Sequence, residues 1–516
     1  MKKRTYRNPV VKGFFPDPSV IRVGEDYYMV NSTFQYFPAI VISHSRDLVH
    51  WEIIGHAITK NEYLDLTGIE DSHGIWAPDI SYYNGTYYIF APLRLNNPEN
   101  GEKGPLRVQL VMKSDRPEGP YSKPVIIPID AIDPSHFIDD DGTHYMVVPP
   151  GVNIIKLNDD CTEVIGEPVA VWPGTGRRAP EGPHIFKKDG FYYAMLAEGG
   201  TGYGHCVTAA RSKNLYGPYE PCPYNPVLTQ TDPEAKLQRA GHGKLVQTQY
   251  GDWWILYLCG RPNEGRFCTL GRETALDPVQ WTEDGWFIVN NLKGPSEEQE
   301  APSLPEVIYP EKNFDDFDDS KLSLEWQFVR NPNELNWSLE ERPGHFRIWT
   351  ENYDLNNIAA RNTLVRREKH HCYEASLKLE FYPSNAGEQA GLVCYYGRRN
   401  YVKMFLTYED DMKKVKVVEN RNKCVTCLGE VSGLQSNVMY FKVKVKKQKR
   451  DFYYSLDNQT WIHVAHISDA RFLSDEGVLE GKHHTGTMVG LYANNGGNGR
   501  RICADFDWFY YHSLES

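Results

Sequence analysis

The chain has 516 residues, more than a single hydrophobic core usually organises, and this length suits two domains. Its formal net charge of -12 and the lack of a basic block argue against nucleic acid as a partner. Aromatic residues make up 13% of the chain, alongside 42 Gly and 33 Pro, and this composition favours an all-β, turn-rich fold.

The N-terminal stretch MKKRTYRNPV is charged, and no apolar run follows it. The sequence therefore predicts neither a secretory signal nor a transmembrane helix, so we expect a cytoplasmic location and no membrane partner. The ten cysteines show no spacing typical of a disulfide framework. Cys424 and Cys427 form one CxxC without a second pair at zinc-finger spacing, so no metal site is predicted there.

The first 260 residues repeat one phrase five times: a short strand, a tight turn with Gly, and an aromatic-rich strand. Asn-Gly or Asp-Gly between apolar runs is the strongest short-range hairpin signal, because the turn requires positive φ. The hairpin glycines are 48 to 61 residues apart, which suits four-stranded units arranged radially. The repeat predicts a five-bladed β-propeller. The hairpin glycines are Gly24, Gly85, Gly142, Gly190 and Gly251.

A carboxylate, an imidazole or an indole stands at a similar position before each hairpin glycine, near the start of the preceding strand. Trp76, Asp133, Glu181 and His242 stand nine residues before the last four glycines, and Asp17 stands seven before the first. Equivalent strands of a propeller line a central funnel, so these side chains should converge on one axis. An Asp before Pro often only starts a strand. Three carboxylates in one register, however, cost too much in repulsion and desolvation to be ordinary core residues, and they predict an active site.

Behind the fifth repeat the chain loses its periodicity and becomes rich in Pro and acidic residues, from LKGPSEEQEAPSLPEV onward. This composition is typical of a linker that lies over the surface. Strand-like alternation then returns, for example in YEASLKLEFY and FYYSLDNQTWIHV, without the Gly-aromatic phrase. We therefore predict a propeller domain over residues 1–300 and a β-sandwich domain over residues 301–516.

Paired carboxylates across a pocket are the minimum equipment for cleaving a glycosidic bond, and a third carboxylate can raise the pKa of the acid. Asp17, Asp133 and Glu181 meet this requirement. The alternative is a sugar-binding propeller without catalysis. The three carboxylates count against that alternative, because a binding site does not need a buried acid.

Several motifs resemble those of glycoside hydrolase family 43, and the resemblance covers nearly the whole chain. It implies a five-bladed propeller followed by a concanavalin-like β-sandwich, which packs on the propeller and lends a loop to the pocket rim. The resemblance continues through LGRETALDPVQW at 270–281. The stretch 314–332, which begins with FDDF, resembles the start of the C-terminal sandwich in the β-xylosidase branch of the family. The blade motifs are FPDPS at 15–19, GIWAPDI at 74–80, IDPSHFIDDDG at 132–142, APEGPHIF at 179–186 and GHGKLVQT at 241–248.

The resemblance also implies roles. Asp17 would be the general base, Glu181 the general acid, and Asp133 the residue that orients Glu181 and tunes its pKa. The family inverts anomeric configuration, so Asp17 would activate water instead of attacking the sugar. A sister group of five-bladed hydrolases that act on fructosides is a further alternative, and product stereochemistry separates the two because those enzymes retain configuration.

Phe34, Trp76, His242 and Arg272 are the substrate contacts that the resemblance implies, since a pentose needs an apolar platform and a few hydrogen-bond donors. Packing between blades is the alternative role for the aromatic residues, and a structural salt bridge is the alternative for Arg272. The resemblance requires no cofactor. It leaves open a structural Ca²⁺ held through water near His242, because calcium prefers oxygen ligands.

The implied activity is the exo-acting release of xylose from the non-reducing ends of β-1,4-xylo-oligosaccharides. α-L-Arabinofuranosidase activity is expected either beside it or as the main activity, because an arabinofuranoside presents similar hydroxyls to the same pocket. The expected partner is therefore a xylo-oligosaccharide or an arabinofuranoside. A homo-oligomer stays open, since periodicity alone does not locate an apolar interface on the sandwich.

Overall fold

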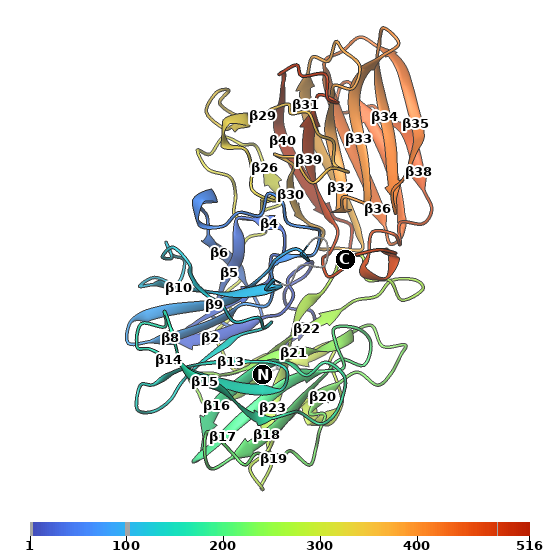
Figure 1. Cartoon of the computed structure of the whole chain (residues 1–516). Helices are drawn as coiled ribbons and strands as arrows, with labels where there is room; N and C mark the ends of the chain where they lie inside the picture. The colour runs from blue at the N-terminus through green and yellow to red at the C-terminus, as the bar shows by residue number, and fades with distance from the viewer. Residues whose placement is uncertain (1–3, 99–103, 482, 516) are drawn as a thin grey trace.

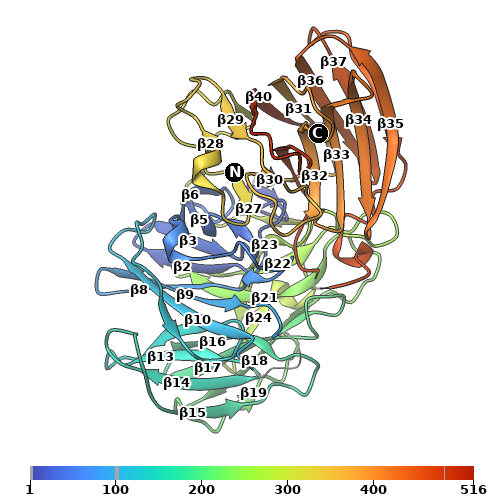
Figure 2. The same cartoon turned by 45° about the horizontal axis from the view of Figure 1, so that its top comes forward.

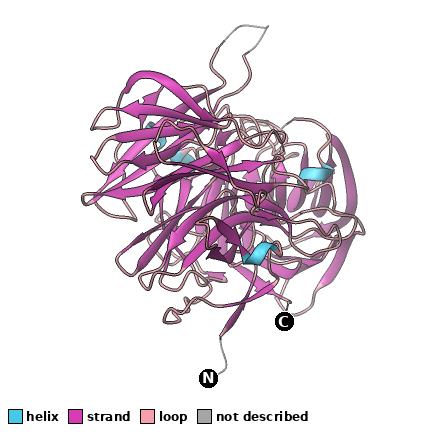
Figure 3. Cartoon of the chain, turned by 90° about the horizontal axis from the view of Figure 1, so that it is seen from below, coloured by secondary structure: helices cyan, strands magenta, loops and turns pink. Residues whose placement is uncertain are grey.

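The computed structural model describes residues 4–98, 104–481 and 483–515; residues 1–3, 99–103, 482 and 516, which the predicted domain ranges include, lie outside the described residues. Strands dominate this part of the chain (Figure 3). None of its helices is long and apolar enough to cross a membrane. The helices described are short 3-10 turns: η1 (Asn61–Tyr63), η3 (Asn290–Leu292), η4 (Glu334–Asn336) and η5 (Asp475–Gly477).

Five antiparallel sheets form the lower half of the molecule, coloured blue to green in Figure 1. Their innermost strands contact one another in the order β2, β8, β12, β16 and β21, and β21 returns to β2. The ring is therefore closed, and the predicted five-bladed propeller is confirmed.

Each blade follows chain order from the funnel outward. Blade 1 comprises β2 (Ser19–Val23), β3 (Asp26–Asn31), β5 (Ala39–Ser45) and β6 (Glu52–Ile58). Blade 2 comprises β8 (Asp79–Tyr83), β9 (Thr86–Arg94), β10 (Arg107–Ser114) and β11 (Val125–Ile127), with β7 (Gly74–Ile75) also paired to β9. Blade 3 comprises β12 (Ser135–Ile138), β13 (His144–Val148), β14 (Val152–Leu157) and β15 (Val164–Trp172).

The last two blades follow the same plan. Blade 4 comprises β16 (Glu181–Lys188), β17 (Phe191–Glu198), β18 (Cys206–Ser212) and β19 (Glu220–Pro221), with β20 (Leu228–Thr229) also paired to β18. Blade 5 comprises β21 (Gln238–Gln247), β22 (Trp253–Gly260), β23 (Glu273–Trp281) and β24 (Phe287–Val289). Beyond blade 5, β25 (Glu298–Glu300) pairs with β1 (Thr5–Arg7), so the two ends of the propeller segment lie together.

The hairpin glycines explain the repeated phrase. Each lies between the first and second strand of a blade, and their φ angles run from +65° at Gly24 to +96° at Gly251. Only glycine adopts this backbone region without steric cost. Apolar side chains then fill the interfaces between blades: Val20 and Met29 of blade 1, for example, pack with Leu256 of blade 5 and close the ring.

Two eight-stranded sheets form the second domain and enclose one large apolar core, which includes Leu377, Phe441, Leu392 and Leu491. This β-sandwich is the predicted second fold. One sheet has the order β28 (Trp337–Ser338), β29 (Phe346–Trp349), β40 (Cys503–Ser513), β31 (Cys372–Phe381), β36 (Val438–Lys446), β37 (Lys449–Ser455) and β38 (Ile462–Ile467), with β26 (Phe314–Asp315) beside β40. The other has the order β35 (Cys424–Leu434), β34 (Met412–Arg421), β33 (Asn400–Glu409), β32 (Gln389–Gly397), β39 (Met488–Asn494), β30 (Leu364–Arg367), β27 (Gln327–Val329) and β4 (Tyr36–Phe37).

The last strand of that second sheet comes from the propeller. β4 leaves blade 1 and pairs with β27, with Tyr36 opposite Val329. Figure 2 shows β27 and β30 next to the blue strands of blade 1. Phe14 and Tyr36 pack there with Tyr395 and Met488 in an apolar cluster that spans both domains. The sandwich is therefore joined to the propeller by a shared sheet as well as by the linker.

The two domains also approach closely at a pair of glycines. A Cβ added to Gly271 would lie 2.7 Å from the Cα of Gly486, and the φ of Gly271 is +75°. Both the space and the backbone conformation therefore require glycine at position 271.

We expect Gly271→Ala to destabilise the protein more than Gly24→Ala. Gly24 has a similar φ, +65°, but nothing within 4 Å of an added Cβ, so its substitution causes backbone strain alone, about 1 kcal/mol. Gly271→Ala adds a clash with the other domain and should cost at least about 2 kcal/mol. Thermal unfolding of the two variants measures the difference, and equal losses would contradict the close approach.

Candidate active site

All seven site residues predicted from the sequence line one pocket. Its volume of about 520 Å³ is typical of small-molecule sites. They come from all five blades or from the loops beside them. The structure thus brings together the whole predicted set. The residues are Asp17, Phe34, Trp76, Asp133, Glu181, His242 and Arg272.

The side chains reach the pocket from different points of their strands. Asp17 and Asp133 stand two residues before β2 and β12, whereas Glu181 is the first residue of β16. His242 lies inside β21, where the pairing with β22 shifts register around it. The strand is thus irregular at His242, whose side chain lines the same pocket as the other four residues that precede the hairpin glycines.

Four of these residues have a left-handed backbone. The φ angles are +53° at Asp17, +52° at Phe34, +45° at Asp133 and +48° at His242. This conformation is uncommon for residues other than glycine and costs about 1–3 kcal/mol each. The surrounding fold stabilises the strained backbone and thereby sets the direction of the side chains.

Asp17 is buried, and donors hold both of its oxygens. Ser32 Oγ donates to Oδ2 at 2.6 Å, and Arg272 Nη1 donates to Oδ1 at 2.6 Å. Such charge-assisted hydrogen bonds offset the cost of burying a carboxylate. Asp17 is thus a fixed carboxylate with a guanidinium at one side.

Glu181 and Asp133 have a different environment. Burial, reinforced by the negative charge of Asp17, raises the pKa of Glu181 to about 7, and Glu181 Oε1 has no hydrogen-bond partner among the described residues. Burial also raises the pKa of Asp133 to about 7; His242 opposes the rise and the charges of Glu181 and Asp17 add to it. Asp133 Oδ2 accepts a hydrogen bond from the backbone N–H of Gly182 at 3.1 Å. A carboxyl that keeps its proton near neutrality beside an ionised one is suited to acid catalysis.

His242 packs against the residue that follows Glu181. A Cβ added to Gly182 would lie 3.1 Å from the His242 ring, and Gly182 has φ +57°. His242 Nδ1 is 4.0 Å from Asp133 Oδ2. The imidazole therefore lies beside both Asp133 and the backbone that carries Glu181.

An aromatic wall lines another side of the pocket. The rings of Phe34 and Trp76 are 6.2 Å apart, and Trp76 meets His484 edge-on at 5.7 Å. His484 belongs to the loop between η5 and β39, so the sandwich contributes to the pocket. Its carbonyl accepts a hydrogen bond from Arg272 Nη2 at 3.1 Å. The rim loop implied by the family resemblance is present.

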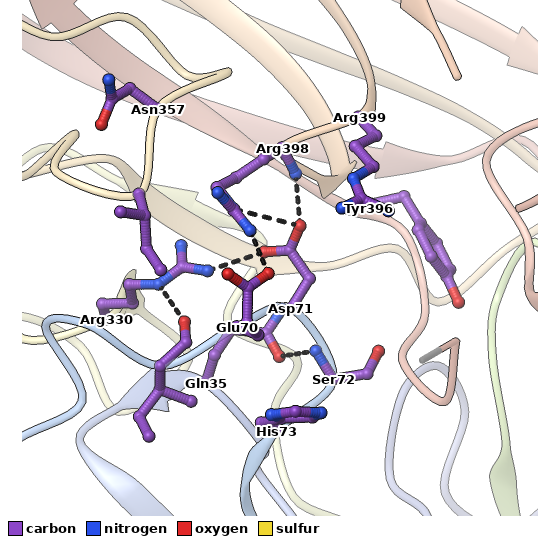
Figure 4. Close-up of polar contacts among 12 residues, drawn as sticks. Gln35, Glu70, Asp71, Ser72, His73, Arg330, Asn357, Tyr396, Arg398 and Arg399 are labelled. Atoms are coloured by element: carbon purple, nitrogen blue, oxygen red, sulfur yellow. Dashed lines mark hydrogen bonds and ion pairs between the residues drawn. The ribbon is translucent and has the colours of Figure 1, made fainter. Parts of the chain in front are cut away.

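The sandwich also fixes a propeller loop, residues 69–73, shown in Figure 4. Arg330 Nε donates to the carbonyl of Ile69 at 2.7 Å, and its Nη2 donates to Asp71 at 2.7 Å. The backbone N–H of Arg398 donates to the same carboxylate at 2.8 Å, and its guanidinium pairs with Glu70.

Ser72, in the same loop, links this clamp to the aromatic wall. Trp76 Nε1 donates to the Ser72 carbonyl at 2.9 Å, and the N–H of His484 donates to Ser72 Oγ at 3.1 Å. The position of Trp76 therefore depends on contacts made by the second domain.

His242 lies among other buried imidazoles, and a calcium ion beside it stays a prediction. Its neighbours His184 and His205 are buried imidazoles, and burial lowers the pKa of both. The nearby carboxylate Asp79 already accepts from the ammonium of Lys244. Calcium takes six to eight oxygen ligands, and these side chains offer mainly nitrogen, so a calcium ion here would take most of its ligands from water.

Away from the pocket, His136, His144 and Cys161 form the one group of three metal-type ligands found among the described residues. His136 Nε2 and His144 Nδ1 are 2.9 Å apart, and Ser81 Oγ lies 2.6 Å from His136 Nδ1. These hydrogen bonds account for the imidazoles without an ion.

Sequence reasoning missed the remaining polar lining. These residues stand outside the blade motifs, in loops or on outer strands; the only local signal is the pair of arginines in GTGRRAP, just before the Glu181 motif. They are Arg94, Asn97, Arg107, Arg178, Thr201 and His484.

Comparison with known proteins agrees with this architecture. Residues 6–287 match the model of glycosyl hydrolases family 43, and residues 314–512 match the β-xylosidase C-terminal concanavalin A-like domain. The crystal structure of a GH43 protein from Bacillus licheniformis is 64% identical, with a TM-score of 0.97 over 99% of this chain and 100% of that one.

Two curated relatives carry different activity names. A xylan 1,3-β-xylosidase from Vibrio is 38% identical over 98% of this chain and 99% of its own length. A non-reducing end α-L-arabinofuranosidase from Bacteroides ovatus is 37% identical over 100% of this chain and 96% of its own.

The raised pKa of Glu181 predicts how stability depends on pH. The folded protein holds this proton more tightly than the unfolded chain, so the wild type loses stability as pH rises from the ordinary value of 4.5 to about 7. Glu181→Gln cannot ionise, and relative to wild type it should gain on the order of 2 kcal/mol over this range. Urea unfolding at several pH values measures the trend.

Asp139→Asn is the control, because its stability relative to wild type should change with pH in the opposite direction to that of Glu181→Gln. Burial of Asp139 is outweighed by hydrogen bonds, chiefly from Lys187, so the net effect is a lowered pKa. Its ionised form stabilises the fold, and the variant should lose stability relative to wild type as pH rises through the acidic range. A Glu181→Gln variant that follows the same trend as Asp139→Asn would refute the raised pKa.

Proposed function

Because this chain belongs to glycosyl hydrolase family 43 and is a glycoside hydrolase, we propose that it releases xylose from the non-reducing ends of β-1,4-xylo-oligosaccharides with inversion of configuration. One observation carries the proposal. Glu181, with a raised pKa and an unpartnered oxygen, shares a pocket with Asp17, whose carboxylate is held by Ser32 and Arg272.

In this mechanism Glu181 protonates the oxygen of the departing sugar, and Asp17 accepts a proton from the attacking water. Arg272 and Ser32 keep the Asp17 carboxylate oriented toward the pocket. Asp133 is the positioning residue: it accepts from the N–H of Gly182, next to Glu181. Its raised pKa limits the negative charge beside the acid.

The pocket wall supplies the sugar contacts. Phe34 and Trp76 offer apolar faces to a pentose ring, and His242 and Arg272 are the hydrogen-bond donors in the same lining. The C-terminal loop with His484 bounds the pocket on one side. A pocket bounded in this way favours attack at a chain end.

α-L-Arabinofuranosidase activity is the second candidate function. It is supported by the 37% identity to a relative that carries this name. Xylose and arabinose present similar hydroxyls, and the types of residue that line the pocket do not favour one sugar over the other. The relative rates on the two substrates decide which activity is the main one.

Proton NMR of xylobiose hydrolysis tests the proposed function. We expect α-xylose as the first product from the β-linked disaccharide, and slower cleavage of an α-L-arabinofuranoside. β-1,3-Xylobiose serves as the linkage control. Initial release of β-xylose would overturn the inverting mechanism, and no cleavage of any of these substrates would overturn the function.

The acid and base roles predict different responses to the leaving group. An aryl xyloside with a good leaving group needs little protonation, so Glu181→Gln should lose about 10³-fold or more on xylobiose but recover most of its rate on the aryl substrate. Asp17→Asn should stay slow on both, because the water still lacks a base.

Steady-state kinetics of the two variants checks these roles. Asp189→Asn, an exposed carboxylate in the blade 4 hairpin, is the control and should behave like wild type. Equal rescue of Asp17→Asn and Glu181→Gln by the aryl substrate would contradict the assignment.

A further inference from the structure

A second pocket, the boundary pocket, adjoins the first where the two domains meet. Its volume is about 530 Å³, and Asn97 and His484 line both pockets. Propeller residues of the clamped loop form one side of it, and residues of the sandwich form the other. Figure 4 shows Arg399 and Tyr396 of the sandwich near Asp71 of that loop. A ligand that extends out of the first pocket past Asn97 and His484 enters the boundary pocket.

The boundary pocket contains a buried acceptor that lacks a partner. Asn400 is 1% exposed, and its Nδ2 donates to the carbonyl of Phe472 at 2.6 Å. Its Oδ1 has no hydrogen-bond partner among the described residues. An unsatisfied buried polar atom costs about 1–3 kcal/mol, so a hydroxyl group that donates to it would be favoured.

Arg399, which also lines the boundary pocket, supplies a donor. The side chain of Arg399 is 33% exposed, and its Nη1 is 3.4 Å from Glu480 Oε2, a long contact that leaves most of the guanidinium fork for other acceptors. Tyr396 is held rigidly, because its hydroxyl donates to Asp475 at 2.6 Å. The lining thus combines an acceptor, a donor and a fixed aromatic side chain.

Each carboxylate of the boundary pocket is paired with at least one cation. Glu70 pairs with Arg398, Asp71 with Arg330, and Glu480 with Arg399. A cationic ligand would therefore find no unpaired carboxylate among these residues, whereas a neutral polyol needs none. The pocket is therefore complementary to neutral sugar hydroxyls.

We propose that the boundary pocket binds the sugar units on the reducing-end side of the cleaved bond, beyond the first two residues of a neutral xylo-oligosaccharide. This inference rests on the proposed function. The first pocket accommodates the disaccharide, and a third or fourth unit gains contacts with Arg399 and Asn400. The second domain thereby selects for chain length.

Arg399→Ala tests the pocket, with Lys423→Ala as a matched control. Both cations pair with Glu480, but Lys423 is not part of the pocket lining. We expect wild-type kcat/KM to increase from xylobiose to xylotriose and xylotetraose. Arg399→Ala should lose about tenfold on the longer substrates, mainly through KM, and should change less than about twofold on xylobiose. Lys423→Ala should keep the wild-type increase.

Asn400→Ala is the second variant, and it should show the same selective loss on the longer substrates. Its folding is checked by thermal unfolding, because the side chain also bonds to Phe472; if it does not fold, Arg399→Ala decides alone. Wild-type enzyme that cleaves all three substrates equally well, or an Arg399→Ala variant that keeps the increase, overturns the boundary pocket and leaves the proposed function standing. Wild-type enzyme that cleaves none of them overturns both.

Discussion

The guanidinium of Arg272 holds three parts of the molecule together at one buried point. It donates to Asp17 next to blade 1, it lies between β22 and β23 of blade 5, and it donates to the carbonyl of His484 in the sandwich. A buried ion pair is favourable only when its geometry and additional hydrogen bonds compensate for lost hydration. The Asp17 carboxylate, blade 5 and the second domain therefore meet at the same group.

The pocket contains groups that lower the stability of the fold but suit the proposed reaction. Burial that raises the pKa of Glu181 and Asp133 also penalises their ionised forms, and the left-handed backbones at Asp17 and Phe34 store further strain. The fold offsets these costs with the apolar clusters between the blades and with the large core of the sandwich. Destabilised groups at a site, supported by well-packed elements around it, are the usual arrangement in enzymes.

The predictable part of the structure was local. The hairpin turns require Gly at fixed points, and the offset back to Asp133 and Glu181 follows from the length of the inner strands, so the blades and the carboxylates could be read from the sequence. His484 could not, because it reaches the pocket only through packing of distant segments. The same holds for β4, which pairs with a strand nearly 300 residues away; no local pattern signals that pairing.

Because the two domains share a sheet, we expect them to evolve together and not to be exchanged separately. Strand β4 belongs by sequence to the propeller and by hydrogen bonding to the sandwich, and the sandwich in turn orients Trp76 through Ser72. Transplanting the second domain from a distant homologue would replace the partner of β4 and the clamp residues Arg330 and Arg398 at once. Lineages of such enzymes are therefore expected to change both halves by coordinated substitution, and domain shuffling is a poor route to new specificities in this architecture.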